Sequence, residues 1–169
     1  TGFRLFSDNC AICHGTDGGG AIGFPNLTDS DWLYGGSPEK IVETIAKGRT
    51  AVMPAWLSVV GEEGVVDVTE YVLQLSSREH DAAKAAKGAK VYETNCVVCH
   101  GVDGKGMQAL GAPNLTDSIW LYGAAPEEIR QTIRHGRNGV MPAHEETLKE
   151  DRIHLLAAYV SSLSLDESK

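Results

Sequence analysis

Two copies of one short motif, Cys-x-x-Cys-His, constrain this chain of 169 residues more than any other feature. The first occupies residues 10–14 and the second residues 96–100. Each offers two thiols for thioether bonds to a porphyrin and a histidine that can reach its iron, which is the c-type haem arrangement. The motifs contain every cysteine of the chain: Cys10, Cys13, Cys96 and Cys99. We therefore expect two covalently bound c-type haems, with His14 and His100 as axial iron ligands.

Two other chemistries share parts of this pattern. Paired Cys-x-x-Cys motifs also form zinc ribbons, but 82 residues separate Cys13 from Cys96, far more than the roughly 15–20 typical of such ribbons. Glycine-rich stretches follow both motifs, at residues 15–20 and 101–106. They lack the Gly-Lys-Ser/Thr ending of a phosphate-binding loop, so we interpret them as tight turns beside the porphyrin.

The motifs belong to a longer internal repeat. The offset between the copies is 86 residues around the motifs and 88 residues after a two-residue insertion. Three later segments match at the larger offset: 25–29 with 113–117, 32–35 with 120–123, and 53–55 with 141–143. A repeat of this length indicates one fold used twice.

Each copy has the pattern of helices joined by loops. Asp81 is a candidate N-cap for a helix over 82–95, and Pro38 and Pro126 stand at first helical positions. Gly48 and Gly136 mark helix ends. The last helix of each half has apolar residues at i, i+3, i+7 and i+10: Val65, Val68, Val72 and Leu75, then Ile153, Leu156, Val160 and Leu163.

These patterns predict an all-α fold class, since no segment shows sustained strand alternation. We expect two tandem domains, residues 1–79 and residues 80–169, each a small helical fold wrapped around one covalent haem c. The short polar segment 76–80 is the expected boundary.

The repeat nominates methionines as the second axial ligands. Met53 and Met141 lie 39 and 41 residues after the histidines of their own repeats, and each precedes Pro-Ala. Methionine opposite histidine raises the haem potential in cytochromes c. The remaining methionine, Met107, has no counterpart in the first copy. His144 is an alternative ligand, whereas His80, His135 and His154 suit solvated or helix-capping roles.

Several further residues are candidates for the haem environment. The carbonyl groups of Pro25 and Pro113 can accept a hydrogen bond from the second nitrogen of each ligand histidine. Arg49 and Arg137 can pair with haem propionates or with local carboxylates. Aromatic residues occupy equivalent places in both copies and suit either a haem edge or ordinary core packing: Trp32, Tyr34, Trp120 and Tyr122.

The chain is acidic, with a formal net charge of −8. Residues 1–80 carry −6 and residues 81–169 carry −2, which argues against a nucleic-acid partner and favours a cationic docking partner, although a soluble acidic surface has the same composition. No apolar run approaches the roughly 18–20 residues of a membrane span. Because the sequence starts at Thr1 without a signal peptide, we expect a processed or excised portion, with any membrane anchor upstream.

With these residues identified, both halves resemble class I cytochrome c domains, and the whole chain resembles the diheme region of the CcoP (FixP) subunit family of cbb(3)-type cytochrome c oxidases. The likeness is carried by the two Cys-x-x-Cys-His-Gly motifs, the Pro-Asn-Leu-Thr-Asp and Trp-Leu-Tyr-Gly segments, the Gly-Arg and Met-Pro-Ala segments, and residues 158–163.

The resemblance implies a periplasmic module, tethered by an N-terminal anchor absent here, that accepts electrons from a small cytochrome c and passes them to membrane oxidase subunits. On this interpretation the chain is an electron-transfer module and not an enzyme on its own. Two alternatives share its motifs: a free diheme carrier in the periplasm, and a diheme peroxidase, which requires one iron with an exchangeable position.

Overall fold

A computed structural model gives the fold of residues 1–164. Contacts divide the chain into two compact units, and each unit combines segments from both halves of the sequence. The first unit comprises residues 1–50 and 139–169, and the second comprises residues 51–138. The last five residues of the expected second domain lie outside the described residues.

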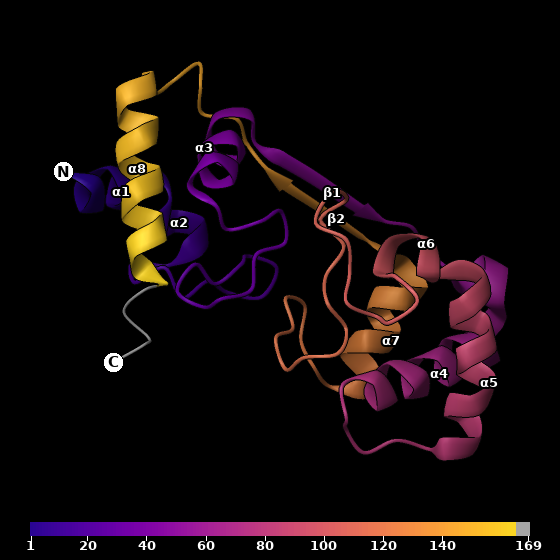
Figure 1. Cartoon of the computed structure of the whole chain (residues 1–169). Coiled ribbons are helices and arrows are strands. Elements are labelled where there is room, and N and C mark those ends of the chain that lie inside the picture. Colours follow the sequence, from indigo (N-terminus) through magenta and orange to yellow (C-terminus); the bar gives the residue numbers. More distant parts are fainter. Residues whose placement is uncertain (165–169) are drawn as a thin grey trace. The chain divides into compact units, whose positions relative to one another are not determined.

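The first unit contains four helices among its described residues (Figure 1): α1 (Gly2–Asn9), α2 (Ala11–His14), α3 (Pro38–Lys47) and α8 (Glu150–Leu163). The Ser37 hydroxyl accepts a hydrogen bond from the Lys40 amide and caps α3, which begins at Pro38 as predicted. The α8 helix packs against both α1 and α3.

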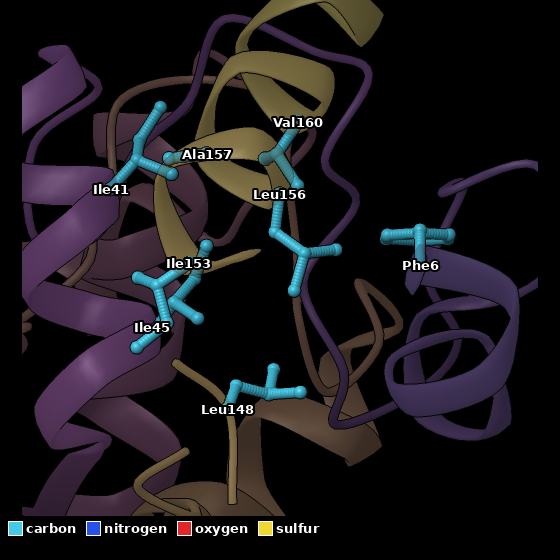
Figure 2. Packing of buried hydrophobic residues seen from close by; sticks show 8 residues of the cluster. All are labelled: Phe6, Ile41, Ile45, Leu148, Ile153, Leu156, Ala157 and Val160. Carbon is cyan, nitrogen blue, oxygen red and sulfur yellow. The ribbon is translucent and has the colours of Figure 1, made fainter. Parts of the chain in front are cut away.

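The core of the first unit forms where these helices meet (Figure 2). Ile153, Leu156 and Val160 of the predicted stripe are buried on α8, and Ile41 and Ile45 of α3 face them. The other buried members of this cluster are Phe6, Leu148 and Ala157. Because α8 supplies much of this core, the first haem motif depends on the C-terminal part of the chain.

The second unit contains α4 (Leu57–Leu75), α5 (Ala82–Asn95), α6 (Val97–His100) and α7 (Pro126–His135) (Figure 1). Asp81 caps α5 as predicted, since its carboxylate accepts hydrogen bonds from the Ala83 and Lys84 amides. The α4 stripe is buried at Val65, Val68 and Val72. The core cluster of this unit comprises Val65, Val68, Val72, Leu73, Tyr92, Ile129 and Ile133.

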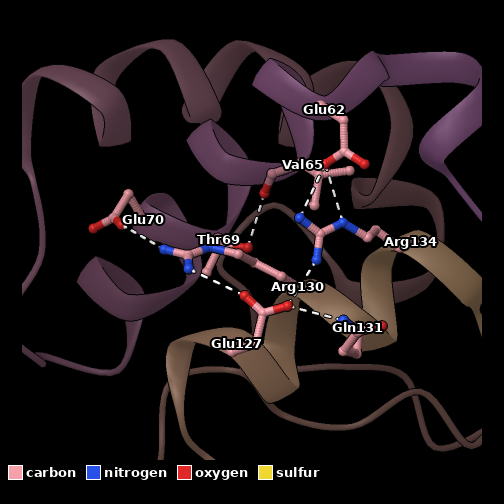
Figure 3. Close-up of polar contacts among 8 residues, drawn as sticks. All are labelled: Glu62, Val65, Thr69, Glu70, Glu127, Arg130, Gln131 and Arg134. Atoms are coloured by element: carbon pink, nitrogen blue, oxygen red, sulfur yellow. Dashed lines mark hydrogen bonds and ion pairs between the residues drawn. The ribbon is translucent and has the colours of Figure 1, made fainter.

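Polar contacts join α4 to α7 beside this core (Figure 3). Arg134 of α7 donates from Nε and Nη2 to the Glu62 carboxylate of α4, at 3.0 and 2.9 Å. Arg130 Nη2 lies 3.5 Å from Oε1 of the buried Glu70 of α4. Within α7, the Glu127 carboxylate accepts a hydrogen bond from the Gln131 side-chain amide at 2.8 Å. The contacts of Arg134 with Glu62 and of Arg130 with Glu70 fix one face of α7 to α4.

The units do not follow the division expected at residues 79 and 80. The segment after α4 is short and polar, as predicted, but α4 and α5 pack against each other within one unit. The Glu70 carboxylate also accepts a hydrogen bond from the Asp81 amide at 2.8 Å, across the expected boundary. A short connection between antiparallel neighbours thus forms a helical hairpin instead of a linker.

The helix-rich fold confirms the predicted helices but corrects the expectation of no strands. A two-stranded sheet joins β1 (Arg49–Met53) and β2 (Arg137–Met141), and the division between the units falls within both strands. Met53 therefore belongs to the second unit and Met141 to the first.

Candidate haem-binding sites

Each haem motif occupies the same local structure. Cys10 lies between α1 and α2, and His14 is the last residue of α2. In the second copy Cys96 lies between α5 and α6, and His100 ends α6. All four cysteines are half-buried, and none of them forms a disulfide. The short helical turn after the first cysteine presents the second cysteine and the histidine within four residues, as a porphyrin with two attachment points requires.

The hydrogen bond predicted for each ligand histidine is present. His14 Nδ1 donates to the Pro25 carbonyl oxygen at 2.9 Å, and His100 Nδ1 donates to the Pro113 carbonyl oxygen at 3.1 Å. Donation from Nδ1 leaves the lone pair of Nε2 available to a metal. The histidines therefore have the tautomer and ring orientation of a metal ligand in both copies.

A glycine makes this hydrogen bond geometrically possible. Gly20 has φ +73°, and a Cβ there would overlap the main chain of Phe24, Pro25 and Asn26. Its amide donates to the His14 carbonyl oxygen at 2.8 Å. The glycine-rich stretch thus turns tightly, as predicted, and holds the proline carbonyl against the histidine.

Burial favours the uncharged form of the first cysteine of each motif and of His100. Burial and the neighbouring thiol raise the pKa of Cys10 and of Cys96 to about 11. Burial also lowers the pKa of His100, against the opposing effect of its hydrogen bond to Pro113. A neutral imidazole is the form that binds iron.

The methionines lie in the opposite units from those expected. Met141 packs against the core cluster of the first unit, together with Cys10, Leu27 and Trp32. Met53 packs against the core cluster of the second unit. The expected pairing of each methionine with the histidine of its own repeat therefore differs from the structure, which brings Met141 to the unit of His14 and Met53 to the unit of His100.

Each methionine segment packs in the unit that contains the histidine of the other repeat, and main-chain hydrogen bonds hold it there. In the first unit, the segment after Met141 docks on the end of α3, where the His144 amide donates to the Ile45 carbonyl at 3.1 Å. In the second unit, the equivalent Trp56 amide donates to the Ile133 carbonyl of α7 at 2.9 Å. Both methionine segments are thus held in place by hydrogen bonds to the helix of the other repeat.

Arginine and tyrosine pair in the same way in both units. The guanidinium of Arg49 lies 4.8 Å from the centroid of the Tyr34 ring, and that of Arg137 lies 4.4 Å from the centroid of Tyr122. Arg49 Nε also donates to Thr44 Oγ1 at 2.9 Å, and Arg137 Nε donates to the equivalent Thr132 at 3.0 Å. Thr44 and Thr132 were not among the residues predicted from the sequence, although the 88-residue offset relates them.

Two polar atoms of the first unit are buried without a hydrogen-bond partner among the described residues. They are the Tyr34 hydroxyl and Arg49 Nη2. The Arg49 guanidinium lies over the Tyr34 ring, and the preceding residue, Gly48, lies directly against the Met141 carbonyl. Arg49 Nη2 and the Tyr34 hydroxyl are donors left over after the contacts of Arg49 with Glu43 and Thr44, and such donors fit the carboxylates of a porphyrin.

The other candidate residues lie in less specific surroundings. Trp32 and Trp120 pack against the core clusters of their units. His80 Nδ1 donates a hydrogen bond to the Arg78 carbonyl oxygen at 2.8 Å. His154 Nε2 lies 3.7 Å from Glu150 Oε1. Within residues 1–164, no group of three or more His, Cys, Asp and Glu side chains is placed to hold a metal ion. The donors of each motif suit a covalently held haem.

Comparisons with known proteins give a consistent result. The sequence pattern of the family described as cytochrome C oxidase, cbb3-type, subunit III matches residues 1–72 and 83–160. The chain is 49% identical over 164 residues to a cbb3-type cytochrome c oxidase subunit CcoP of Rubrivivax gelatinosus, covering 96% of this chain and 54% of that protein. It is 46% identical over 173 residues to the FixP subunit of Bradyrhizobium diazoefficiens, covering 96% and 60%.

The chain thus spans little more than half the length of these relatives. Within its described part, none of the helices has the length and apolar character that crossing a membrane requires.

Proposed function

The chain belongs to the cbb3-type cytochrome c oxidase subunit III family, and from this premise we propose that it relays electrons from a small periplasmic cytochrome c to the catalytic core of a cbb3-type haem–copper oxidase. Two covalent c-type haems, one per unit, supply the one-electron couples. The protein residues bind and orient these groups and do not themselves catalyse a reaction.

The observation that carries the proposal is the repeated histidine geometry. His14 and His100 each direct Nδ1 to a proline carbonyl from the end of a helical turn that bears two thiols. A metal-bound imidazole needs this kind of support to keep its orientation in both oxidation states. Identical support in both units favours two centres of the same kind.

We further propose that Met141 is the axial ligand opposite His14 and that Met53 is the ligand opposite His100. The assignment follows from the units in which these residues lie. A thioether ligand on the second side closes the iron to exchangeable ligands, so electrons pass without rearrangement of the protein. This closure favours electron transfer over a peroxidase reaction, which needs an open position.

The acidic surface supports the choice of a cationic donor. The first unit carries 7 basic and 12 acidic side chains and the second carries 8 and 11, so both units are net negative. Charge complementarity accelerates the encounter of small redox proteins. We place the chain in the periplasm, beside the membrane subunits of the oxidase.

Oxygen uptake by the complete oxidase tests the relay. We expect two haems per chain by a denatured-protein haem assay. Variants that lose both motifs, such as Cys13→Ser with Cys99→Ser, should lose oxygen uptake driven by reduced cytochrome c. A small chemical reductant that reaches the core directly should still drive the reaction in these variants. Unchanged uptake with cytochrome c would reject the relay, and a chain isolated without oxidase subunits would favour a free carrier.

A further inference from the structure

We propose that Glu43 lowers the redox potential of the haem at Cys10–His14 by neutralising Arg49, and that its counterpart Gln131 leaves the charge of Arg137 uncompensated, so that the haem at Cys96–His100 has the higher potential. This inference rests on the proposed function, and it orders the two centres that the repeat makes otherwise alike.

The two arginines occupy equivalent positions but have different partners. In the first unit, Arg49 Nη1 lies 3.1 Å from Glu43 Oε1. In the second unit, Arg137 hydrogen-bonds to the Thr132 hydroxyl through Nε and Nη2, at 3.0 and 2.7 Å. Among residues 1–164, no carboxylate forms an ion pair with Arg137.

The difference comes from one substitution within the repeat. Position 131 is related to position 43 by the 88-residue offset and holds glutamine instead of glutamate. The Gln131 amide donates to Glu127 at 2.8 Å (Figure 3). Glu127 is also contacted by Arg130 and Arg134, so its charge is balanced by cations of α7.

The main chain directly before each arginine lies against the main chain of the candidate methionine ligand of its unit. Gly48, directly before Arg49, packs against the Met141 carbonyl, and Gly136, directly before Arg137, packs against the Met53 carbonyl. The side chain of Arg49 is only 19% exposed. Charges at such half-buried positions are screened less by salt than charges on the open surface.

An electron added to a haem lowers the charge of the iron centre by one unit. A nearby cation therefore stabilises the reduced form and raises the potential, and a carboxylate bound to that cation cancels much of this effect. Glu43 is charged at neutral pH, and it keeps its charge in mild acid because hydrogen bonds from Lys40 and Arg49 lower its pKa to about 2.

The net charge of the two units also favours a lower potential for the haem at Cys10–His14. The helix α3 with Arg49 and the helix α7 with Arg137 each contain three basic and two acidic side chains, so total helix charge does not distinguish the sites. The first unit as a whole is more acidic, at −5 against −3. Direct contact with Glu43 is therefore the local feature that separates the two arginines.

Redox titration of the haem-loaded protein with optical detection tests the inference. We expect two separate potentials in the wild type. Glu43→Gln should raise the lower potential and leave the higher one nearly unchanged. Gln131→Glu, the reciprocal change, should lower the higher potential. Each variant should thus narrow the gap between the two centres.

Glu39→Gln is the matched control, because it removes the same charge from the same helix. Glu39 bonds to Ser37 and not to Arg49, so its shift should be smaller than that of Glu43→Gln. Equal shifts from both variants, no shift, or a rise of the higher potential in Glu43→Gln would overturn the inference. Two haems with unmoved potentials would reject this inference alone, whereas fewer than two haems in the wild type would reject the proposed function.

Discussion

Gly88 of α5 lies directly against the main chain of Asp67 on α4, and a Cβ at position 88 would overlap the Asp67 carbonyl. This contact sets the closest approach of the two helices that form the hairpin of the second unit. Gly2, its counterpart at the 86-residue offset, lies against the Tyr159 side chain of α8, where a Cβ would come within 2.6 Å. Both haem motifs follow a helix that packs through a glycine.

Gly88→Ala should destabilise the haem-loaded protein. Alanine favours a helix over glycine by up to about 1 kcal/mol, but forced overpacking costs about 1–3 kcal/mol, and here the obstacle is a carbonyl group that cannot rotate away. We expect a net loss in the free energy of unfolding, measured by chemical denaturation. Gly2→Ala should cost less, because the added Cβ would meet one carbon closely, Tyr159 Cβ at 2.6 Å, and would stay 3.3 Å from the nearest main-chain atom, the Leu155 carbonyl oxygen. Equal stability of Gly88→Ala and the wild type would contradict the described helix crossing.

The exchanged methionines predict which haem each variant affects. In a protein that carries haem only at Cys10–His14, made by replacing Cys96 and Cys99 with serine, Met141→Ala should convert the iron from low spin to high spin. Met53→Ala should leave that iron low spin. Electron paramagnetic resonance and optical spectra distinguish the two states. The reverse result would restore the pairing within each repeat.

Tyr92→Phe should weaken the second unit modestly. The Tyr92 hydroxyl donates to the Gly101 carbonyl at 2.8 Å, directly after His100, and the ring is almost fully buried. Loss of such a hydrogen bond costs about 1 kcal/mol. The first repeat has Phe6 at this position. Thermal unfolding should show a lower midpoint than for Tyr71→Phe, whose hydroxyl forms no hydrogen bond among the described residues. Identical midpoints would exclude a stabilising role for the hydroxyl.

Acid should destabilise the protein partly through Glu43. Its pKa falls from an ordinary 4.5 to about 2 in the folded state, because of hydrogen bonds from Lys40 and Arg49. A lowered carboxyl pKa contributes stability above the unfolded value, and this contribution is lost as the pH falls from about 4.5 to about 2. Urea unfolding at a series of pH values should therefore give a shallower decline for Glu43→Gln. Parallel curves for the two proteins would show that the ion pairs do not contribute.

Local sequence signals predicted the helices well. The helix starts at Pro38 and Asp81 depend on contacts within a few residues, and both are confirmed. The stripe on α8 depends on a single apolar face, and its burial is confirmed as well. The sequence did not predict the strands, because some of their polar residues are partly buried and some of their apolar residues are exposed. Arg49 and Met53 are half-buried, whereas Val52 and Val140 are exposed at 67% and 66%, so no apolar alternation marks β1 or β2.

The sequence by itself determined the repeat, the two haem motifs and the proline carbonyl that supports each histidine, because these depend on identical short segments. Only the tertiary structure decided which methionine lies in the unit of which histidine. The segments around Met53 and Met141 share the sequence Val-Met-Pro-Ala, so local sequence does not choose between the end of α3 and the end of α7. The choice depends on packing between helices far apart in the sequence, in which α4 joins α7 and α8 joins α1 and α3. Each unit therefore takes one helix, α8 or α4, from the other half of the expected division.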